Sequence, residues 1–133
     1  MEGQKRQILI VDDDSFLLDM YALKFSQNNF EVYTAGSAAQ AIEKLKGGLC
    51  PRVMLVDIIM PEMDGFEMLE KINMEKICPS CLKIILSNKS QQADIDRGNS
   101  LGVVGYIVKA NSTPAEVIDQ VASILGKNIT APK

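Results

Sequence analysis

Five short apolar segments recur along the chain, and each is followed by a stretch long enough to form a helix. They lie at Gln7–Val11, Glu31–Ala35, Val53–Val56, Leu82–Leu86 and Val104–Val108. Three of them are nearly continuous rather than alternating, which is typical of strands buried on both faces. Between them, hydrophobic residues follow helical spacing, as Leu17, Tyr21 and Phe25 do. Repeated strand–helix units predict an α/β fold: a doubly wound sheet of five parallel strands, with helices on both faces.

Local signals mark where the predicted helices begin and end. Capping residues are expected at Asp14, Ser37 and Thr113, with Pro114 in a first helical position. Gly47 and Gly48 end the second helix, and Gly102 ends the fourth. Asp64 lies three residues before Glu67, which favours a helix cap over a chemical role.

The fourth helix, expected at 91–101, is the weakest of the five. It contains Gly98 near its end, and a glycine inside a helix costs about 1 kcal/mol relative to alanine. We therefore expect this helix to be the one most easily remodelled.

The length and net charge of the chain limit the kinds of protein it can be. The 133 residues suit one domain, spanning 1–133, and the formal net charge is −3. No run of lysine and arginine exceeds two residues, so direct nucleic-acid binding is not expected. The apolar run Ile8–Val11 is too short for a signal peptide or a membrane span, so no membrane contact and a cytoplasmic location are expected.

The three cysteines suggest neither a disulfide framework nor a metal site. Cys78 and Cys81 have CxxC spacing, but a redox CxxC follows a strand and opens a helix, whereas this pair precedes an apolar segment. A structural zinc site needs four ligands, and only three thiols and no histidine are present. The spacing is therefore interpreted as a coincidence within a loop.

Polar side chains follow four of the five predicted strands. Asp12 and Asp13 follow the first, Asp57 the third, Ser87 the fourth and Lys109 the fifth. In such a sheet, ligands bind outside the carboxyl ends of the strands, so these side chains should converge. Acids packed together without a cation would raise one another's pKa values. Because all candidate ligands are hard oxygens, the sequence predicts Mg²⁺ as the cofactor.

This set of residues suggests phosphoryl transfer. Asp57 can attack phosphorus as a carboxylate nucleophile, while Lys109 and the metal neutralise charge and Ser87 donates to a phosphoryl oxygen. Pro61 biases Met60 away from helical conformation, which keeps a loop beside the acid.

The segments ILIVDDD, DIIMPEMDG, the serine after LKIIL, and YIVK occur in an order and at spacings that resemble the receiver domain of two-component response regulators. The resemblance covers about residues 7–125 and leaves 126–133 as a tail. It implies a flavodoxin-like (βα)5 fold with strand order 2-1-3-4-5. It also implies phosphorylation of Asp57 by a sensor histidine kinase or a phosphotransfer protein.

The resemblance further implies a role for each site residue. Mg²⁺ would be bound by Asp12, Asp13, Asp57 and the backbone carbonyl of Ile59. Ser87 and Tyr106 would form a switch pair, although a tyrosine next to Gly105 can also simply pack. Phosphorylation would then reshape the surface of the fourth helix, fifth strand and fifth helix for a downstream protein partner, with the chain a monomer or a phosphorylation-dependent homodimer.

The chain departs from the family pattern at three places. Ala110 follows Lys109 where the family usually has a proline after a cis peptide bond, and a cis bond before alanine costs roughly 3 kcal/mol. The bond is therefore either trans or a source of strain. Ser87 replaces the frequent threonine but keeps the hydroxyl. Ile59 and Lys89 flank the path of attacking water in the family, and since Ile59 cannot orient water, a phosphorylated Asp57 should be long-lived.

Three functions remain open at this stage. The first is a phosphorylation-controlled signalling switch with no output domain in this chain, an assisted phosphoacceptor rather than an enzyme. The second is a small phosphohydrolase of the haloacid-dehalogenase type, which would need an acid where this chain has Ile59. The third is a receiver-like binding module that is never phosphorylated, for which Ala110 is the only support.

Overall fold

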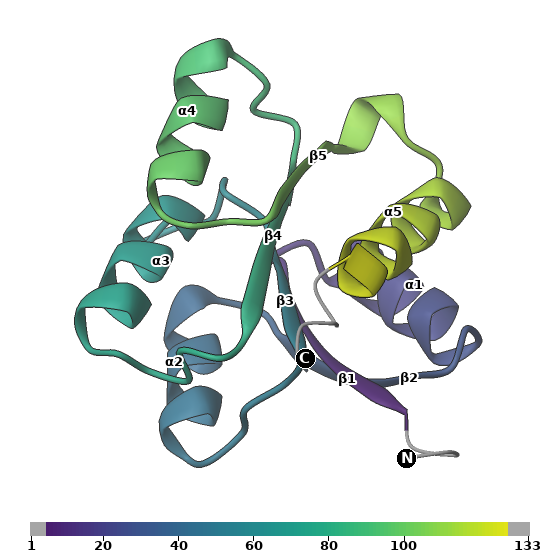
Figure 1. Cartoon of the computed structure of the whole chain (residues 1–133), viewed down its shortest axis with the longest axis horizontal. Coiled ribbons are helices and arrows are strands. Elements are labelled where there is room, and N and C mark those ends of the chain that lie inside the picture. The colour runs from purple at the N-terminus through teal and green to yellow at the C-terminus, as the bar shows by residue number, and fades with distance from the viewer. Residues whose placement is uncertain (1–4, 128–133) are drawn as a thin grey trace.

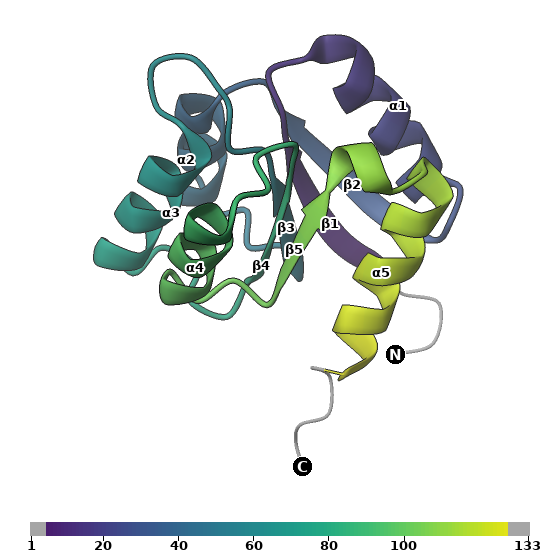
Figure 2. The ribbon, with the colours of Figure 1, turned by 90° about the horizontal axis from the view of Figure 1, so that it is seen from above.

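The computed structural model describes residues 5–127, and its five strands form one parallel sheet in the order β2-β1-β3-β4-β5. Figures 1 and 2 show α1 and α5 on one face of the sheet and α2, α3 and α4 on the other. This confirms the predicted fold and strand order. The elements are β1 (Arg6–Val11), α1 (Ser15–Ser26), β2 (Phe30–Ala35), α2 (Ala38–Lys46), β3 (Val53–Val56), α3 (Gly65–Met74), β4 (Leu82–Ser87), α4 (Gln92–Ser100), β5 (Gly105–Val108), the 3-10 turn η1 (Lys109–Asn111) and α5 (Pro114–Lys127).

The central strands are buried on both faces, as their continuous apolar sequences predict. Every residue of β3 is buried, and so are the last four residues of β1. Side chains of β1 alternate between two hydrophobic layers: Ile8 packs with Phe25 under α1 and α5, while Leu9 packs with Met68 under α2 and α3. Burying each such side chain stabilises the fold by about 1.5–3 kcal/mol, so the register of the central strands is strongly specified. Among residues 5–127, no helix has the length and hydrophobicity needed to cross a bilayer.

The predicted helix caps are confirmed. The side chains of Asp14 and Ser37 accept hydrogen bonds from the first turns of α1 and α2. Asp64 and Glu67 form a reciprocal capping box, with distances of 2.8 Å and 2.9 Å between side-chain oxygens and backbone nitrogens. Thr113 and Glu116 form the same arrangement at the start of α5.

The weak fourth helix has a packing explanation. Gly98 is the buried residue of α4, and a Cβ atom at this position would lie 2.9 Å from Cδ1 of Ile85 and 3.3 Å from Cδ2 of Tyr106. The glycine therefore allows α4 to approach the sheet closely, although it weakens the helix itself. α4 is held by close approach over a small area rather than by large buried side chains.

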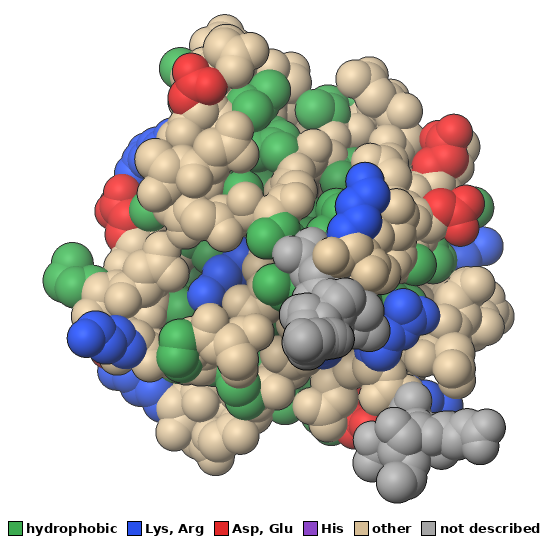
Figure 3. Space-filling model, in the orientation of Figure 1, with side chains coloured by type: hydrophobic (Ala, Val, Ile, Leu, Met, Phe, Trp, Pro, Cys, Tyr) green, Lys and Arg blue, Asp and Glu red, His purple; other side chains and the backbone are tan. Residues whose placement is uncertain are grey.

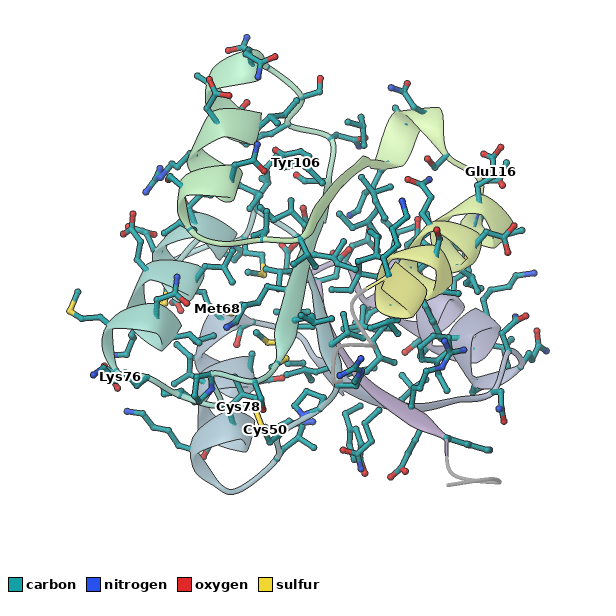
Figure 4. The ribbon with its side chains drawn as sticks, viewed as in Figure 1. Cys50, Met68, Lys76, Cys78, Tyr106 and Glu116 are labelled. Carbon is teal, nitrogen blue, oxygen red and sulfur yellow. A yellow bond between two sulfur atoms is a disulfide. The ribbon has the colours of Figure 1, made fainter. Side chains whose placement is uncertain are left out.

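The expectation that no disulfide forms is wrong. Cys50, after α2, is bonded to Cys78, after α3, with their Cα atoms 5.6 Å apart (Figure 4). Cys81 is a buried free thiol, so the CxxC pair itself is not bonded. The two bonded cysteines are 28 residues apart, and the pairing of Val53 with Leu82 brings their loops together. Only the tertiary structure reveals this proximity.

Gly65, the first residue of α3, lies against the backbone of Asp57. Its N–H donates to the carbonyl of Ile58 at 2.9 Å. A Cβ atom here would lie 2.4 Å from the carbonyl oxygen of Asp57 and 2.9 Å from Cα of Ile58. Both neighbours are backbone atoms that cannot move aside by a side-chain rotation.

We expect Gly65→Ala to destabilise the protein by about 1–3 kcal/mol, because the added methyl group must displace the backbone that carries Asp57. Urea unfolding measures the change. Gly126→Ala in α5 is the matched control, since nothing lies within 4 Å of its Cβ position and alanine favours helix there. Equal stability of the two variants would contradict this account of the close contact.

Candidate functional site

The carboxyl ends of β1, β3 and β5 meet at one edge of the sheet. Val11 pairs with Val56 in the parallel register, and the N–H of Asp57 donates to the carbonyl of Val11 at 3.0 Å. Asp12 and Asp57 are therefore side by side, each directly after a buried strand. Lys109 reaches the same place from the end of β5. The convergence expected from the sequence is observed.

Three carboxylates form the centre of this edge. One oxygen from each of Asp12, Asp13 and Asp57 lies within 4.8 Å of the other two. Asp12 and Asp57 are buried, whereas Asp13 is exposed, so the cluster is open to solvent on one side. The N–H of Asp14 donates to Oδ1 of Asp12 at 2.9 Å and orients that carboxylate.

Lys109 is the cation that holds the two buried acids together. Its Nζ lies 2.8 Å from Oδ2 of Asp12 and 3.2 Å from Oδ2 of Asp57. Burial by itself would lower the pKa of Lys109, but the hydrogen bond to Asp12 and the charge of Asp57 outweigh burial, so the pKa is raised. Lys109 is thus held in its charged form.

The pKa of Asp57 is raised above its ordinary value of 3.8. Burial is the largest cause, and the charge of Asp12 acts in the same direction, while Lys109 and a hydrogen bond with Ser87 oppose it. Three carboxylates against one ammonium leave a formal surplus of two negative charges. The donor atoms are all hard oxygens, which suits a divalent cation such as Mg²⁺.

Ser87 ends β4 and is fully buried beside this cluster. Its Oγ accepts a hydrogen bond from the N–H of Lys89 at 3.3 Å. The hydroxyl is therefore shared between the loop that begins α4 and the carboxylate of Asp57.

Tyr106 lies on β5 facing α4, where Figure 4 labels it. Its hydroxyl donates to the carbonyl of Lys89 at 2.6 Å, and its ring lies against Gly98. Ser87 and Tyr106 thus both bind the backbone of Lys89, Ser87 at its N–H and Tyr106 at its carbonyl. The predicted pair is joined through this loop residue rather than by direct contact.

Asn88 is a site residue that the sequence interpretation missed. Its Oδ1 accepts a hydrogen bond from the N–H of Ala110 at 2.8 Å, which ties the loop after β4 to the turn that follows Lys109. A proline at position 110 has no N–H and could not make this bond. The signal in the sequence is Ala110 itself, since alanine brings a backbone N–H that the family's usual proline lacks.

The side chain of Ile59 is largely exposed to solvent, and the side chain of Lys89 is paired with Asp94 rather than with Asp57. The side chain of Ile59 is 58% exposed, and Nζ of Lys89 lies 3.6 Å from Oδ1 of Asp94. The N–H of Ile59 lies 3.4 Å from Oδ1 of Asp57.

Comparison with known proteins gives a consistent result. The family described as "Response regulator receiver domain" matches residues 8–122. The transcriptional regulatory protein PhoP of alkaline phosphatase synthesis in Bacillus subtilis is 28% identical over 128 residues, which are 96% of this chain and 52% of PhoP. The DNA-binding response regulator MtrA of Mycobacterium tuberculosis is 26% identical over 132 residues, 99% of this chain and 56% of MtrA.

The chain thus spans about half the length of these curated relatives. Among solved structures, a CheY-like receiver domain protein from Methanospirillum hungatei has a TM-score of 0.83 and 28% identity, covering 92% of this chain and 95% of that one. The chemotaxis protein CheY4 of Vibrio cholerae, at 23% identity and a TM-score of 0.83, covers 91% of this chain and 99% of its own.

The raised pKa of Asp57 predicts that its charge destabilises the metal-free fold. The folded state holds the proton more tightly than the unfolded state, so stability is lost as the pH rises through the folded pKa. We expect Asp57→Asn to unfold at higher urea concentration than the wild type at pH 7 in EDTA.

The difference should shrink as the pH falls and disappear well below the reference value of 3.8, where the carboxyl is neutral in both states. Measuring both proteins across this range cancels the titration of groups that do not interact with position 57. A variant less stable than the wild type at pH 7 would show that the pairing with Lys109 outweighs burial.

Proposed function

Because the chain belongs to the response regulator receiver family, we propose that it is a signalling switch controlled by Mg²⁺-dependent phosphorylation of Asp57. The observation that carries the proposal is the meeting of three carboxylates and Lys109 at the carboxyl ends of the strands. Asp12, Asp13 and Asp57, with the backbone carbonyl of Ile59, would hold the Mg²⁺ ion, which supplies positive charge beside the phosphoryl oxygens.

The chain's own residues have distinct parts in the transfer. A carboxylate oxygen of Asp57 attacks the phosphorus of a phosphohistidine, and the bond from phosphorus to the histidine nitrogen breaks. Lys109 neutralises charge that builds on the phosphoryl oxygens, since it is already charged and within reach of Asp57. The chain is a phosphoacceptor that assists its own modification rather than an enzyme with a turned-over substrate.

The phosphoryl group would act on the loop that starts α4. It adds a charge of about −1.5 to −2 and three acceptor oxygens, which compete for the hydroxyl of Ser87. If Ser87 turns toward the phosphoryl group, the N–H of Lys89 loses its acceptor. Tyr106, bonded to the carbonyl of the same residue, is then free to turn inward. α4 buries little of itself, so it can follow this change.

The surface formed by α4, β5 and α5 is the proposed partner-binding face. Figure 3 shows hydrophobic side chains over β5, between α4 and α5. Val104, just before β5, is 37% exposed, and Tyr106 on β5 is partly buried. A downstream protein, or a second phosphorylated copy of the chain, would bind this face. The phosphodonor would be a sensor histidine kinase or a phosphotransfer protein, in the cytoplasm.

A second candidate is a receiver-like module that is never phosphorylated. The contact between Asn88 and Ala110 favours it, because this bond holds together two loops that must move if the switch operates. The complete set of acids and Lys109 favours the switch.

Intact mass spectrometry tests the proposed phosphorylation. After incubation with Mg²⁺ and acetyl phosphate, we expect the mass to increase by one phosphoryl group, and we expect no increase in EDTA or with Asp57→Ala. Ser87→Ala and Lys109→Ala keep the acceptor but should slow the modification. No increase in the wild type would support the unphosphorylated module.

The phosphorylated state should be long-lived, because the apolar side chain of Ile59 cannot orient an attacking water. We expect Ile59→Asn to lose the phosphoryl group several-fold faster than the wild type, since an amide can hold water near the phosphorus. Decay is followed by mass after removal of the phosphodonor. Decay of the wild type within seconds would contradict this role of Ile59.

A further inference from the structure

The three sulfur atoms lie together at the edge of the sheet opposite the acid site. Cys50 lies before β3 and Cys78 lies before β4, whereas Asp57 and Ser87 follow the other ends of these strands. Cys81 contributes to the hydrophobic layer against which Cys78 packs. The phosphoacceptor chemistry proposed above makes no use of this cluster.

The accessibility of the sulfur atoms separates the bonded pair from the third cysteine. Cys50 is exposed and Cys78 is half-buried, so a small molecule can reach their bond. Cys81 is 4% exposed, and burial raises the pKa of its thiol to about 11. A thiol of this kind is scarcely ionised near neutral pH and does not compete as a nucleophile.

The loop that carries Cys78 has a costly backbone conformation. Lys76 and Cys78 have φ angles of 55° and 43°, in the left-handed region that residues with a side chain seldom occupy. Such conformations persist only when surrounding contacts enforce them. The bridge to Cys50 is one such contact, and the ion pairs of Glu75 with Lys46 and Lys71 are others.

We propose that Cys50 and Cys78 form a thiol–disulfide exchange site for small thiols of the glutathione type. The thiolate of one glutathione attacks the sulfur of Cys50, a mixed disulfide forms, and Cys78 leaves as a thiolate. A second glutathione then attacks the mixed disulfide. Two electrons pass to the protein, which gains two thiols, and one molecule of glutathione disulfide is released. When glutathione disulfide is in excess, the same steps run in reverse and re-form the bond between Cys50 and Cys78.

Exchange at this site would change the stability of the domain against unfolding. The bridge closes a 28-residue loop that contains all of β3 and α3. Closing a loop of this length restricts the unfolded chain, so the oxidised protein should melt at a temperature higher by on the order of 10 °C. Disulfides that are exposed, or held by a strained backbone, are reduced more readily than buried structural ones. We therefore expect the Cys50–Cys78 bond to respond to the ratio of reduced to oxidised glutathione.

The experiment equilibrates the whole chain in buffers with different ratios of reduced to oxidised glutathione. Free thiols are then blocked with an alkylating reagent, and mass spectrometry counts them and maps the bonded pair. We expect one free thiol in the oxidised buffer and three in the reduced buffer, with a bonded peptide pair containing Cys50 and Cys78. The difference in melting temperature should persist in Cys81→Ala and disappear in Cys50→Ser.

Three results would overturn the proposal. They are three free thiols in oxidised glutathione, an intact bridge in excess reduced glutathione, and a bond that joins Cys78 to Cys81. None of these measurements depends on phosphorylation, so they remain decisive whatever Asp57 does.

Discussion

Repulsion between buried carboxylates, balanced by one ammonium group, is the constraint on which this structure depends. Asp12 and Asp57 follow two adjacent buried strands, and the register of those strands leaves them no freedom to separate. Lys109 bonds both. The pKa of Asp57 is raised because burial and Asp12 outweigh Lys109, and this incomplete balance suits a group that we propose binds a cation and accepts a phosphoryl group.

The remainder of the molecule divides into a rigid part and a weakly held part. The last four residues of β1 and all of β3 are buried, which fixes the positions of Asp12 and Asp57. By contrast, α4 buries Gly98, and the loop before it is held by single hydrogen bonds to Ser87, Tyr106 and Ala110. A charge added to Asp57 would therefore have the rigid central strands on one side and the weakly held loop before α4 on the other. This difference in packing is the physical basis for the proposed switch.

Strand and helix positions were predictable because their causes are local. A strand buried on both faces needs a continuous apolar run, and helix caps such as Asp64 and Glu67 act over three residues. The meeting of the strand ends was predictable as well, since parallel strands present their carboxyl ends at one edge. The contact of Gly65 with the Asp57 backbone, by contrast, depends on how closely α3 approaches the sheet, and no residue pattern states that distance.

The sequence alone is enough to predict the fold, the edge of the sheet where the candidate site lies, and which acids, hydroxyl and lysine meet there. These follow from hydrophobic periodicity and strand direction, which are properties of short segments. Packing of the whole chain was needed to bring Cys50 to Cys78, Asn88 to the N–H of Ala110, and Lys89 between Ser87 and Tyr106. Each is a contact between segments distant in the sequence or a choice among several available partners, and its formation depends on loop paths that packing alone sets.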